Sequence, residues 1–517
     1  MKKTIIIVGA GLAGMTAALQ AAKEGCDVKL ISSMPSERAQ SVMAEGGINA
    51  ALNTKGEDDS PEQHYEDTIR AGCGLADEGA VWDMTHAAPE LVRWLHSIGV
   101  QFNTCGYDEI DLRNFGGQKK KRTAFAQSDT GKQLMTALID AVRKNESNGK
   151  IQRLFHHRFQ ALFLNAGKCF GCMIRDDYTG ESLSLTGNAV IIATGGFHGL
   201  FGDTTGSLAN TGEVTAELFR QGIPMANLEM IQYHPTTVEI GGKRMLISEA
   251  ARGEGGRLFA YRDGKPWYFM EEKYHELGNL MPRDITAREI WRVGQESCVF
   301  LDMTEIPEAV VEKKLSGLAD DCLTYLHKDI RKEPIPVSPG IHYFMGGIAV
   351  DSQHRTEIKG LYAAGECCAQ YHGANRLGGN SLLGAIYGGK VAAETACRES
   401  TDHTSLPFDD QQPISPEVSP KEKTQLNRIL LDALGVVRNE ASLESALKEI
   451  QLIKGPLPLL GQAVLKSALA RRESRGAHFR EDYPERNDTD FKKTTVARYD
   501  GLTISITIES LPERRCT

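Results

Sequence analysis

The segment His372–Leu382 combines one cation with small residues that let a ligand approach the backbone closely. The cation is Arg376, and arginine is the side chain best suited to bind a planar carboxylate through two parallel hydrogen bonds. The apolar run Gly360–Glu366 lies just before this segment and ends in a glycine and a carboxylate. Together the two segments predict a cofactor and a small acid held side by side.

A second glycine-rich turn, Gly9–Gly14, lies near the N-terminus. It follows the β-branched run Thr4–Val8 and precedes the alanine-rich stretch Met15–Glu24. In this context the Gly-x-Gly-x-x-Gly pattern binds a pyrophosphate at a helix N-terminus. The acidic residue expected after the second strand, Val28–Ile31, is absent, because Ile31-Ser-Ser33 stands there. Serine hydroxyls can still reach a ribose, but the missing acid argues against plain NAD binding.

The composition excludes some classes of partner. A net charge of −9 gives no reason to expect nucleic acid or an anionic membrane. The longest apolar runs have the length of strands, so no direct membrane span is expected. Eleven cysteines are scattered without a disulfide framework, which indicates a reducing compartment. Cys169-Phe-Gly-Cys172 lies between strand-like segments and is interpreted as part of a hairpin, so no metal site is predicted.

The elements that must position these motifs recur far apart in the chain. Beyond the two N-terminal strands, Asn188–Thr194 and Gly360–Glu366 are further buried strands of the nucleotide-binding type. They predict a doubly wound α/β domain that an insertion interrupts. The insertion is placed at about 229–339, where the composition becomes more charged. It is expected to contain helices at Arg283–Trp291 and Glu308–Lys328.

The C-terminal part differs in composition. The polar, proline-bearing stretch Ser400–Ser419 is interpreted as a linker. Apolar spacing typical of helices follows at Glu422–Leu434, Leu443–Leu452 and Leu459–Arg472. Val496–Ile508 alternates like two strands around Asp500-Gly501 and predicts a hairpin. The charge run Lys119–Arg122 is interpreted as a solvated loop.

Further motifs occur in a fixed order along the chain. They are Ala44-Glu-Gly-Gly47, Ala193-Thr-Gly-Gly196, Gln232-Tyr-His-Pro-Thr236, Arg252-Gly-Glu-Gly-Gly256, Pro282-Arg-Asp284, His342-Tyr-Phe-Met-Gly-Gly347 and Glu473-Ser-Arg-Gly-Ala-His478. With Gly9–Gly14 and His372–Leu382, this set resembles the flavoprotein subunit of fumarate reductase and succinate dehydrogenase, with L-aspartate oxidase as a close sister family. The resemblance covers essentially the whole chain.

The resemblance implies a Rossmann-like FAD-binding domain, an inserted α+β capping domain and a C-terminal helical domain. The expected bounds are 1–228 and 340–398 for the FAD-binding domain, 229–339 for the capping domain, 399–419 for the linker, 420–485 for the helical domain and 486–517 for a tail with the hairpin.

The resemblance also implies which residues contact FAD. They are Gly9, Ala10, Gly11, Gly14, Ser32, Gln40, Ser41, Glu45, Gly46, Gly47, Phe159, Ala193, Thr194, Gly195, Glu213, Tyr343, Glu366, Arg376, Ser381 and Leu382. Glu366 has a rationale of its own, because a carboxylate at a strand end accepts hydrogen bonds from sugar hydroxyls. Glu213 stands where the family usually has aspartate.

A dicarboxylate site is implied next to the flavin. It would consist of Phe115, His234, Ser248, His342 and Arg376. Taken singly, each histidine is more commonly an ordinary packed residue, but both lie in matching motifs. Ser248 replaces the usual threonine of the family and keeps the hydroxyl. Phe115 would press on the substrate, although a plain core aromatic is the alternative.

By the same resemblance, Arg283 corresponds to the proton donor of the reaction. Arginine is a weak acid in solution, with a pKa above ~12, so it needs a partner that returns its proton. Glu249 and Arg252 have the i, i+3 spacing of one helical face and match the proton relay of the family. A surface ion pair is the alternative interpretation of these two residues.

Gln40 is the informative departure from the family, because the histidine that bonds covalently to flavin would fall there. A glutamine amide is not a competent nucleophile toward the flavin methyl group. Non-covalent FAD is therefore expected. The lost linkage should lower the flavin potential and favour fumarate reduction, and Glu45 agrees, since the reductases tend to carry glutamate at that position.

The sequence thus predicts a fumarate reductase flavoprotein. L-Aspartate oxidase is one alternative, but its Glu-Gly-Gly-His segment is replaced by Phe115-Gly-Gly-Gln118. Reduction of another unsaturated acid is a second alternative. A third alternative is an electron-transfer subunit without its own substrate. Such a subunit would lack the arginines and histidines named above for the dicarboxylate site, and all of them are present.

The expected partner is an iron–sulfur subunit, with or without a membrane anchor subunit, because the chain has no iron–sulfur cysteine cluster of its own. A soluble nicotinamide- or thiol-driven electron donor remains an alternative. The expected location is the cytoplasm, either free or peripheral on the cytoplasmic face of the membrane through partner subunits.

Overall fold

The computed structural model describes residues 2–106, 109–399 and 418–511 of the chain. Within them lies a five-stranded parallel sheet with the strand order β22-β12-β1-β2-β8. Its strands are β1 (Thr4–Val8), β2 (Asp27–Ser32), β8 (Ile151–Phe155), β12 (Ala189–Ile192) and β22 (Leu361–Ala363). The predicted βαβ unit and the late return of the chain to the same sheet are confirmed, and so is the α/β fold class.

The two faces of this sheet belong to different hydrophobic cores, because side chains alternate along each strand. Ile5 and Ile7 share a core with residues of the helices α1 (Leu12–Lys23), α3 (Glu78–Ser97), α4 (Thr130–Ser147) and α11 (Asn380–Glu399). Ile6 and Val8 share a core with residues of β9 (His157–Asn165), β10 (Lys168–Asp176) and β11 (Ser182–Thr186). The expected hairpin is confirmed in β9 and β10, with Cys169 and Cys172 buried inside β10.

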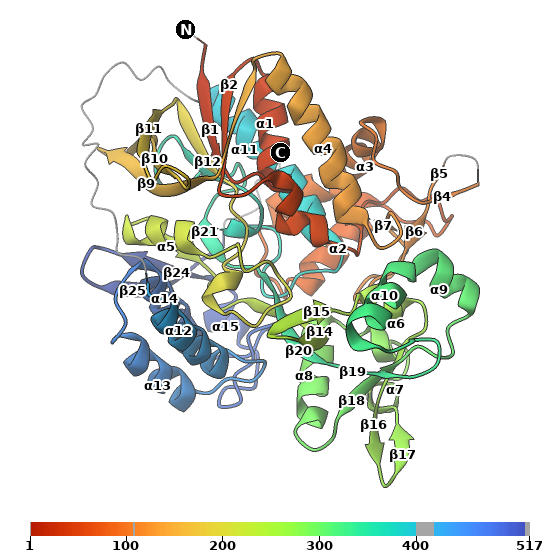
Figure 1. Ribbon diagram of the computed structural model, residues 1–517. Helices are drawn as coiled ribbons and strands as arrows, with labels where there is room; N and C mark the ends of the chain where they lie inside the picture. The colour runs from red at the N-terminus through yellow and green to blue at the C-terminus, as the bar shows by residue number, and fades with distance from the viewer. Residues whose placement is uncertain (1, 107–108, 400–417, 512–517) are drawn as a thin grey trace.

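An inserted segment, which we call the capping segment (residues 231–344), lies against the ends of the parallel strands (Figure 1). One of its sheets contains β14 (Ile231–Ile240), β15 (Lys243–Leu246) and β20 (Ser338–Phe344). A second contains β16 (Arg257–Arg262), β17 (Lys265–Trp267), β18 (Val299–Asp302) and β19 (Ile335–Pro336). The helices of this segment include α6 (Glu249–Gly253) and α8 (Arg283–Gly294).

The single helix expected at Glu308–Lys328 is wrong. The chain instead forms α9 (Glu308–Lys314), α10 (Ser316–Asp321) and a π-turn, η5 (Cys322–Leu326), which ends at His327 with φ 57°. The break at Leu315 brings Gly317 against Ser128, where a Cβ on the glycine would lie 2.8 Å from the serine Cβ. Contact with a distant segment therefore decides where this helix stops.

The C-terminal part packs beneath the parallel sheet in Figure 1 as the helices α12 (Pro420–Ala433), α13 (Glu440–Ile450) and α14 (Pro456–Ala470). A capping box between Ser419 and Glu422 fixes the start of α12. Most of the expected linker, residues 400–417, lies outside the described residues. The predicted hairpin is confirmed as β24 (Thr494–Tyr499) and β25 (Ile504–Glu509).

The hairpin is part of a mixed sheet with the order β23-β21-β13-β24-β25. The other strands are β13 (Met225–Ala226), β21 (Gly347–Ala349) and β23 (Cys368–Ala369). The hairpin therefore pairs directly, through β24, with β13, the strand that precedes the capping segment.

A network of buried charges joins these parts. Arg471, at the end of α14, donates from Nε to Oε1 of Glu229 at 2.6 Å and from a terminal nitrogen to Oε1 of Glu473 at 2.9 Å. It also donates to the hydroxyl of Thr495 on β24 at 2.8 Å. Arg471, Glu229 and Glu473 are fully buried, so their charges depend on one another.

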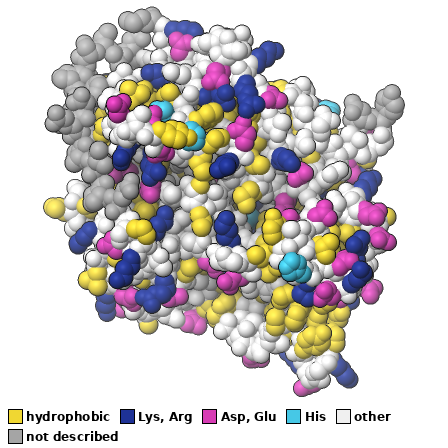
Figure 2. Space-filling view, in the orientation of Figure 1, with side chains coloured by type: hydrophobic (Ala, Val, Ile, Leu, Met, Phe, Trp, Pro, Cys, Tyr) yellow, Lys and Arg dark blue, Asp and Glu magenta, His cyan; other side chains and the backbone are white. Residues whose placement is uncertain are grey.

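The interpretation of Lys119–Arg122 as a solvated loop is wrong for its last residue. Arg122 is fully buried and forms ion pairs with Asp59 at 2.8 Å and Asp67 at 2.9 Å. On the face shown in Figure 2, acidic and basic side chains are otherwise intermixed, and hydrophobic side chains gather over β16 and β17 of the capping segment.

Candidate functional site

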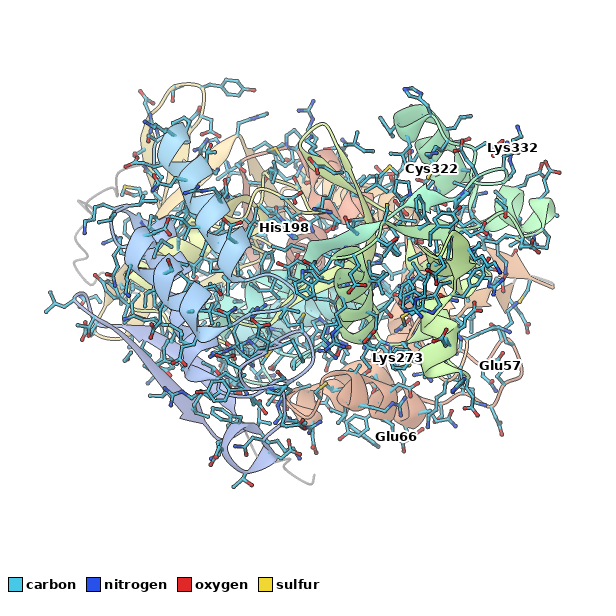
Figure 3. All side chains as sticks on the ribbon, turned by 90° about the horizontal axis from the view of Figure 1, so that it is seen from below. Glu57, Glu66, His198, Lys273, Cys322 and Lys332 are labelled. Carbon is cyan, nitrogen blue, oxygen red and sulfur yellow. The ribbon has the colours of Figure 1, made fainter. Side chains whose placement is uncertain are left out.

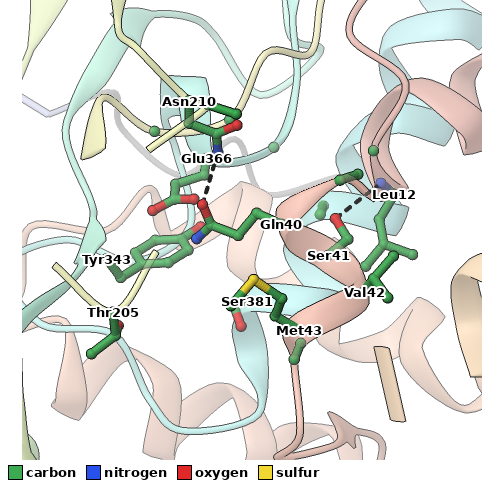
Figure 4. A pocket seen from close by; sticks show the side chains of 18 of the residues that line it. Leu12, Gln40, Ser41, Val42, Met43, Thr205, Asn210, Tyr343, Glu366 and Ser381 are labelled. Carbon is green, nitrogen blue, oxygen red and sulfur yellow. Dashed lines mark hydrogen bonds between the residues drawn. The ribbon is translucent and has the colours of Figure 1, made fainter. Parts of the chain in front are cut away.

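A cavity of about 1150 Å³ lies between the carboxyl ends of the parallel strands and the capping segment. Ligands of open α/β sheets bind at this edge. The loops that follow β1, β2, β12 and β22 form one wall, and η2 (Gln40–Met43) completes it (Figure 4). Residues of β15, α6 and α8 form the opposite wall.

The predicted FAD residues that line this cavity are Gly9, Ala10, Gly11, Ser32, Gln40, Ser41, Glu45, Gly46, Gly47, Phe159, Ala193, Thr194, Gly195, Glu213, Tyr343, Glu366, Arg376, Ser381 and Leu382. Gly14 does not line it. A Cβ on Gly14 would lie 1.8 Å from the carbonyl oxygen of Gly9, so this glycine lets α1 pack closely against the end of β1. Gly11 stands at the N-cap of α1, where free backbone N–H groups favour an anion.

The polar groups of this wall fit an FAD molecule, because several of them are free to form hydrogen bonds with a ligand. The Thr194 hydroxyl, one carboxyl oxygen of Glu45 and Nε of Arg376 are buried without a hydrogen-bond partner. Buried polar atoms of this kind are normally satisfied, so each is available to a bound group. When FAD is bound, the glycine turn and the N-terminus of α1 would hold its pyrophosphate.

The far end of the cavity gathers the predicted substrate residues, which are Phe115, His234, Ser248, His342 and Arg376. The rings of His234 and His342 lie 5.1 Å apart at 67°. His342 Nδ1 lies 2.7 Å from the hydroxyl of Thr205, and Arg376 stacks 4.5 Å from the ring of Tyr343. Apart from Thr205, the sequence had placed each of these side chains in the site.

Burial and nearby cations decide the charges at this end. Burial lowers the pKa of both His234 and His342 well below the usual value, and Arg283 lowers them further, so both imidazoles are neutral at pH 7. Burial and Arg283 lower the pKa of Arg376 only to about 9, so its guanidinium stays charged. A buried cation beside neutral donors requires an anionic ligand.

Arg283 connects this end of the cavity to a chain of charges. Its Nε and a terminal nitrogen donate to Oε2 of Glu249 at 2.9 and 2.7 Å. Oε1 of Glu249 accepts from Arg252 at 3.3 Å. Burial tends to raise the pKa of Glu249, but the two arginines hold it below its usual value. Arg252 does not line the cavity and lies behind Glu249, as the i, i+3 spacing on α6 predicts.

Gln232 is a functional residue that sequence reasoning missed. Its Oε1 accepts from Arg283 at 3.2 Å, and its Nε2 donates to the carbonyl oxygen of Arg376 at 2.9 Å and to Asn375 at 2.8 Å. It therefore fixes the two arginines relative to each other. The signal was present, because Gln232 and His234 are two residues apart on a strand and share a face.

Glu45 is half-buried in the cavity wall, with one carboxyl oxygen fully buried, and it lies near Asp321 of the capping segment. Burial, with Asp321 and then Asp129, raises its pKa to about 8 against the opposing effect of Arg113. The folded chain therefore keeps a proton that the unfolded chain releases near pH 4.5. The stability from this group is complete below about pH 4.5 and is lost as the pH rises toward 8.

This shift gives a pH prediction for the FAD-free protein. In wild type, Glu45 should make the free energy of unfolding fall by up to about 1.4 kcal/mol per pH unit between about pH 5 and 8. Glu45→Gln should remove that part of the slope in chemical denaturation, whereas Glu37→Gln, at an exposed acid paired with Arg143, should leave it unchanged. Equal slopes in wild type and Glu45→Gln would contradict the buried, protonated carboxyl.

Two features are absent from residues 2–106, 109–399 and 418–511. No helix in these ranges has the length and apolar character needed to cross a bilayer. No group of three or more histidine, cysteine, aspartate or glutamate side chains in them could hold a metal ion.

Comparisons with known proteins match this arrangement. The family model of the FAD binding domain covers residues 4–382, and that of the fumarate reductase flavoprotein C-terminus covers residues 455–514. The succinate dehydrogenase flavoprotein subunit of Bacillus subtilis is 38% identical over 551 aligned residues, which cover 96% of this chain and 94% of that protein. The L-aspartate oxidase of Streptomyces coelicolor is 33% identical, with 98% and 94% covered.

Among solved structures, the FrdA chain of a mutant E. coli quinol fumarate reductase aligns with a TM-score of 0.88 at 27% identity. The alignment covers 100% of this chain and 97% of that chain. The similarity therefore extends over the parallel sheet, the capping segment and the C-terminal part together.

Proposed function

Because this chain belongs to the family of succinate dehydrogenase and fumarate reductase flavoprotein subunits, which are FAD-dependent oxidoreductases, we propose that it reduces fumarate to succinate. The observation that carries the proposal is the pair of buried arginines, Arg283 and Arg376, at one end of the cavity with two neutral histidines beside them. The two carboxylates of a C4 dicarboxylate match this arrangement of charge and donors.

The residues of the predicted dicarboxylate site bind and orient the substrate. Arg376 holds one carboxylate through two parallel hydrogen bonds, the Ser248 hydroxyl donates to a remaining oxygen, and the rings of His234 and His342 enclose the same end of the substrate. Phe115, which is buried against the cavity, presses on the carbon chain. Bound FAD supplies the hydride that adds to one alkene carbon.

Arg283 supplies the proton for the other alkene carbon. The guanidinium is held by Glu249 through two nitrogens, so one N–H can point toward the substrate in a fixed direction. After the transfer, the Glu249 carboxylate takes a proton from Arg252 and passes it to Arg283, and Arg252 regains a proton from solvent on the side away from the cavity. The sum is one hydride and one proton added to fumarate.

A panel of acids tests the substrate. The purified chain with FAD should reduce fumarate with a reduced viologen dye as electron donor, and should not oxidise L-aspartate. Faster reduction of another unsaturated acid would replace fumarate as the substrate but keep the reaction type. Oxidation of L-aspartate at a higher kcat/KM than the reduction of fumarate would contradict the proposal.

The position of Gln118 argues against L-aspartate oxidase. Its amide donates to Oδ1 of Asn49 at 3.0 Å and to the carbonyl oxygen of Gly378 at 2.8 Å, and it does not line the cavity. The oxidase family carries a Glu-Gly-Gly-His segment here to meet the substrate amine, where this chain has Phe115-Gly-Gly-Gln118. Gln118 instead forms a hydrogen bond to the backbone of the segment that carries Arg376.

We also infer that FAD is bound without a covalent bond, because Gln40 offers an amide where an imidazole would be needed. Acid precipitation of the purified protein should release all of the flavin into the supernatant. Heat-denatured protein mixed with free FAD serves as the control for trapping. Flavin that remains on the washed pellet in excess of this control would contradict non-covalent attachment.

Electrons must reach the flavin from outside the chain. The relatives from B. subtilis and Haemophilus influenzae are both named as flavoprotein subunits, which supports a multi-subunit complex here. The proposed partner is an iron–sulfur subunit, and the proposed location is the cytoplasm or the cytoplasmic face of the membrane through such partners. Copurification of an iron–sulfur protein with the native chain is the expected result, and a native chain isolated alone and reduced directly by a nicotinamide or a thiol would contradict it.

A further inference from the structure

The amide of Gln40 is held on both sides by the protein itself. Its Oε1 accepts from the backbone N–H of Ser207 at 3.1 Å and from Nδ2 of Asn210 at 2.8 Å (Figure 4). Because a backbone N–H can only donate, this end of the amide must be the oxygen. The amide NH2 group therefore points the other way, toward Nε2 of His198 at 3.0 Å.

The hydrogen bonds around His198 fix which of its nitrogens carries the proton. The hydroxyl of Thr204 donates its only hydrogen to the carbonyl oxygen of Ile341 at 3.1 Å, so it accepts from His198 Nδ1 at 2.7 Å. With the proton on Nδ1, Nε2 of the neutral ring is an acceptor. It takes the N–H of Gln40.

His198 also lies next to the carboxylate of Glu366, in the loop that follows β22. Its Nε2 is 3.3 Å from Oε1 of Glu366, and that oxygen accepts from the backbone N–H of Phe344 at 3.1 Å. The imidazole packs edge-on against the ring of Phe344, with centroids 5.0 Å apart. Gln40 and Glu366 both line the cavity, whereas His198 lies behind them and is fully buried. Figure 3 places it in the interior.

We propose that His198 is a positioning residue for FAD, which holds the Gln40 amide at a fixed place in the cavity wall. The proposal rests on the proposed non-covalent attachment of FAD. In this chain the segments 40–43, 198–210, 341–344 and 366 are joined by hydrogen bonds between protein groups alone. A wall that is ordered in advance binds its ligand more tightly, because less motion is lost on binding.

Two substitutions of similar polarity separate the positioning role from a general effect on folding. His198→Gln can place an amide oxygen where Nε2 stands and keep the bond from Gln40. His198→Asn is one bond shorter, so it can satisfy Thr204 but cannot reach Gln40. Both remove the ring and its packing on Phe344, and both should lower the melting temperature by a similar amount.

The measured quantity is the dissociation constant of FAD, from the fluorescence of flavin released on dilution of the purified full-length holoprotein. His198→Asn should weaken FAD binding by about 10- to 100-fold, the usual effect of leaving a buried hydrogen-bonding group unsatisfied. His198→Gln should stay within about threefold of wild type. In a Gln40→Ala background, His198→Asn should have at most a threefold further effect, because the contact is already lost.

His354→Asn is the matched control. His354 is also fully buried and bonded through both ring nitrogens, to the carbonyl oxygen of Ala363 and the hydroxyl of Tyr371, but it does not line the cavity. It should leave the dissociation constant of FAD unchanged.

Wild-type affinity in His198→Asn, equal losses in the Asn and Gln variants, or a full effect of His198→Asn in the Gln40→Ala background would each overturn the proposal. The readout does not involve fumarate, so a wrong substrate leaves it intact. Flavin retained after acid precipitation would overturn both the attachment mode and the positioning role, and is detected separately.

Discussion

Replacement of Arg283 by alanine is expected to lower fumarate turnover by about 10³-fold or more while FAD remains bound. General acid catalysis contributes typically about 10²- to 10⁴-fold, and the same substitution also removes a buried cation that faces the substrate. The cofactor should be retained, because none of the glycine-turn contacts of the cavity involves this side chain. Turnover and flavin absorbance of the purified variant measure the two effects separately.

Arg292→Ala is the matched control for this experiment. Arg292 lies on the same helix, α8, is about half exposed and pairs with Glu289 rather than with a cavity residue. It should keep wild-type turnover. Residual turnover of Arg283→Ala above about a tenth of wild type would refute the role of proton donor, and loss of flavin would show that the side chain also supports the cofactor wall.

Replacement of Arg471 by methionine is expected to lower the free energy of unfolding by about 3–5 kcal/mol. The substitution removes the partner of Glu229 and one of the partners of Glu473, and both carboxylates are fully buried. It also leaves the hydroxyl of Thr495 and backbone carbonyls without their donor. Chemical denaturation followed by circular dichroism measures the loss.

Arg472→Met tests whether position and burial cause this effect. Arg472 is the next residue in the chain and is exposed, so the change should stay within about 0.5 kcal/mol. A second test combines Arg471→Met with Glu229→Gln, which removes the unpaired charge and should recover part of the loss. Equal stability of Arg471→Met and Arg472→Met would contradict the idea that the buried network holds the C-terminal part.

The sequence was sufficient to predict features that depend on local spacing. The glycine turn after β1 and the i, i+3 pair on α6 lie where residue spacing placed them. The failures share a different cause. His198 follows a double glycine, and its partners at 40, 204 and 366 come from other loops, so no local pattern marks it.

Two other errors have the same origin. The lysines next to Arg122 indicate an exposed side chain. Its ion-pair partners, Asp59 and Asp67, are distant in the sequence, so this local pattern does not reveal that it is buried. The apolar residues Val311, Leu315, Leu318 and Cys322 have a helical spacing that suits a continuous helix as well as a broken one. What stops the helix is the contact of Gly317 with Ser128, and a periodicity cannot report a contact between distant segments.

The strand order of the parallel sheet has a consequence for how the protein is made. β12 lies between β1 and β22, so its outer edge stays open until the chain has been synthesised past residue 363. The loop that carries Arg376 and Ser381 is made later still. A nascent chain on the ribosome therefore has an incomplete cofactor wall and an unpaired strand edge. An unpaired edge of this kind promotes aggregation. The cofactor wall is complete only when the chain has been made past Leu382, so FAD is expected to bind after that stage.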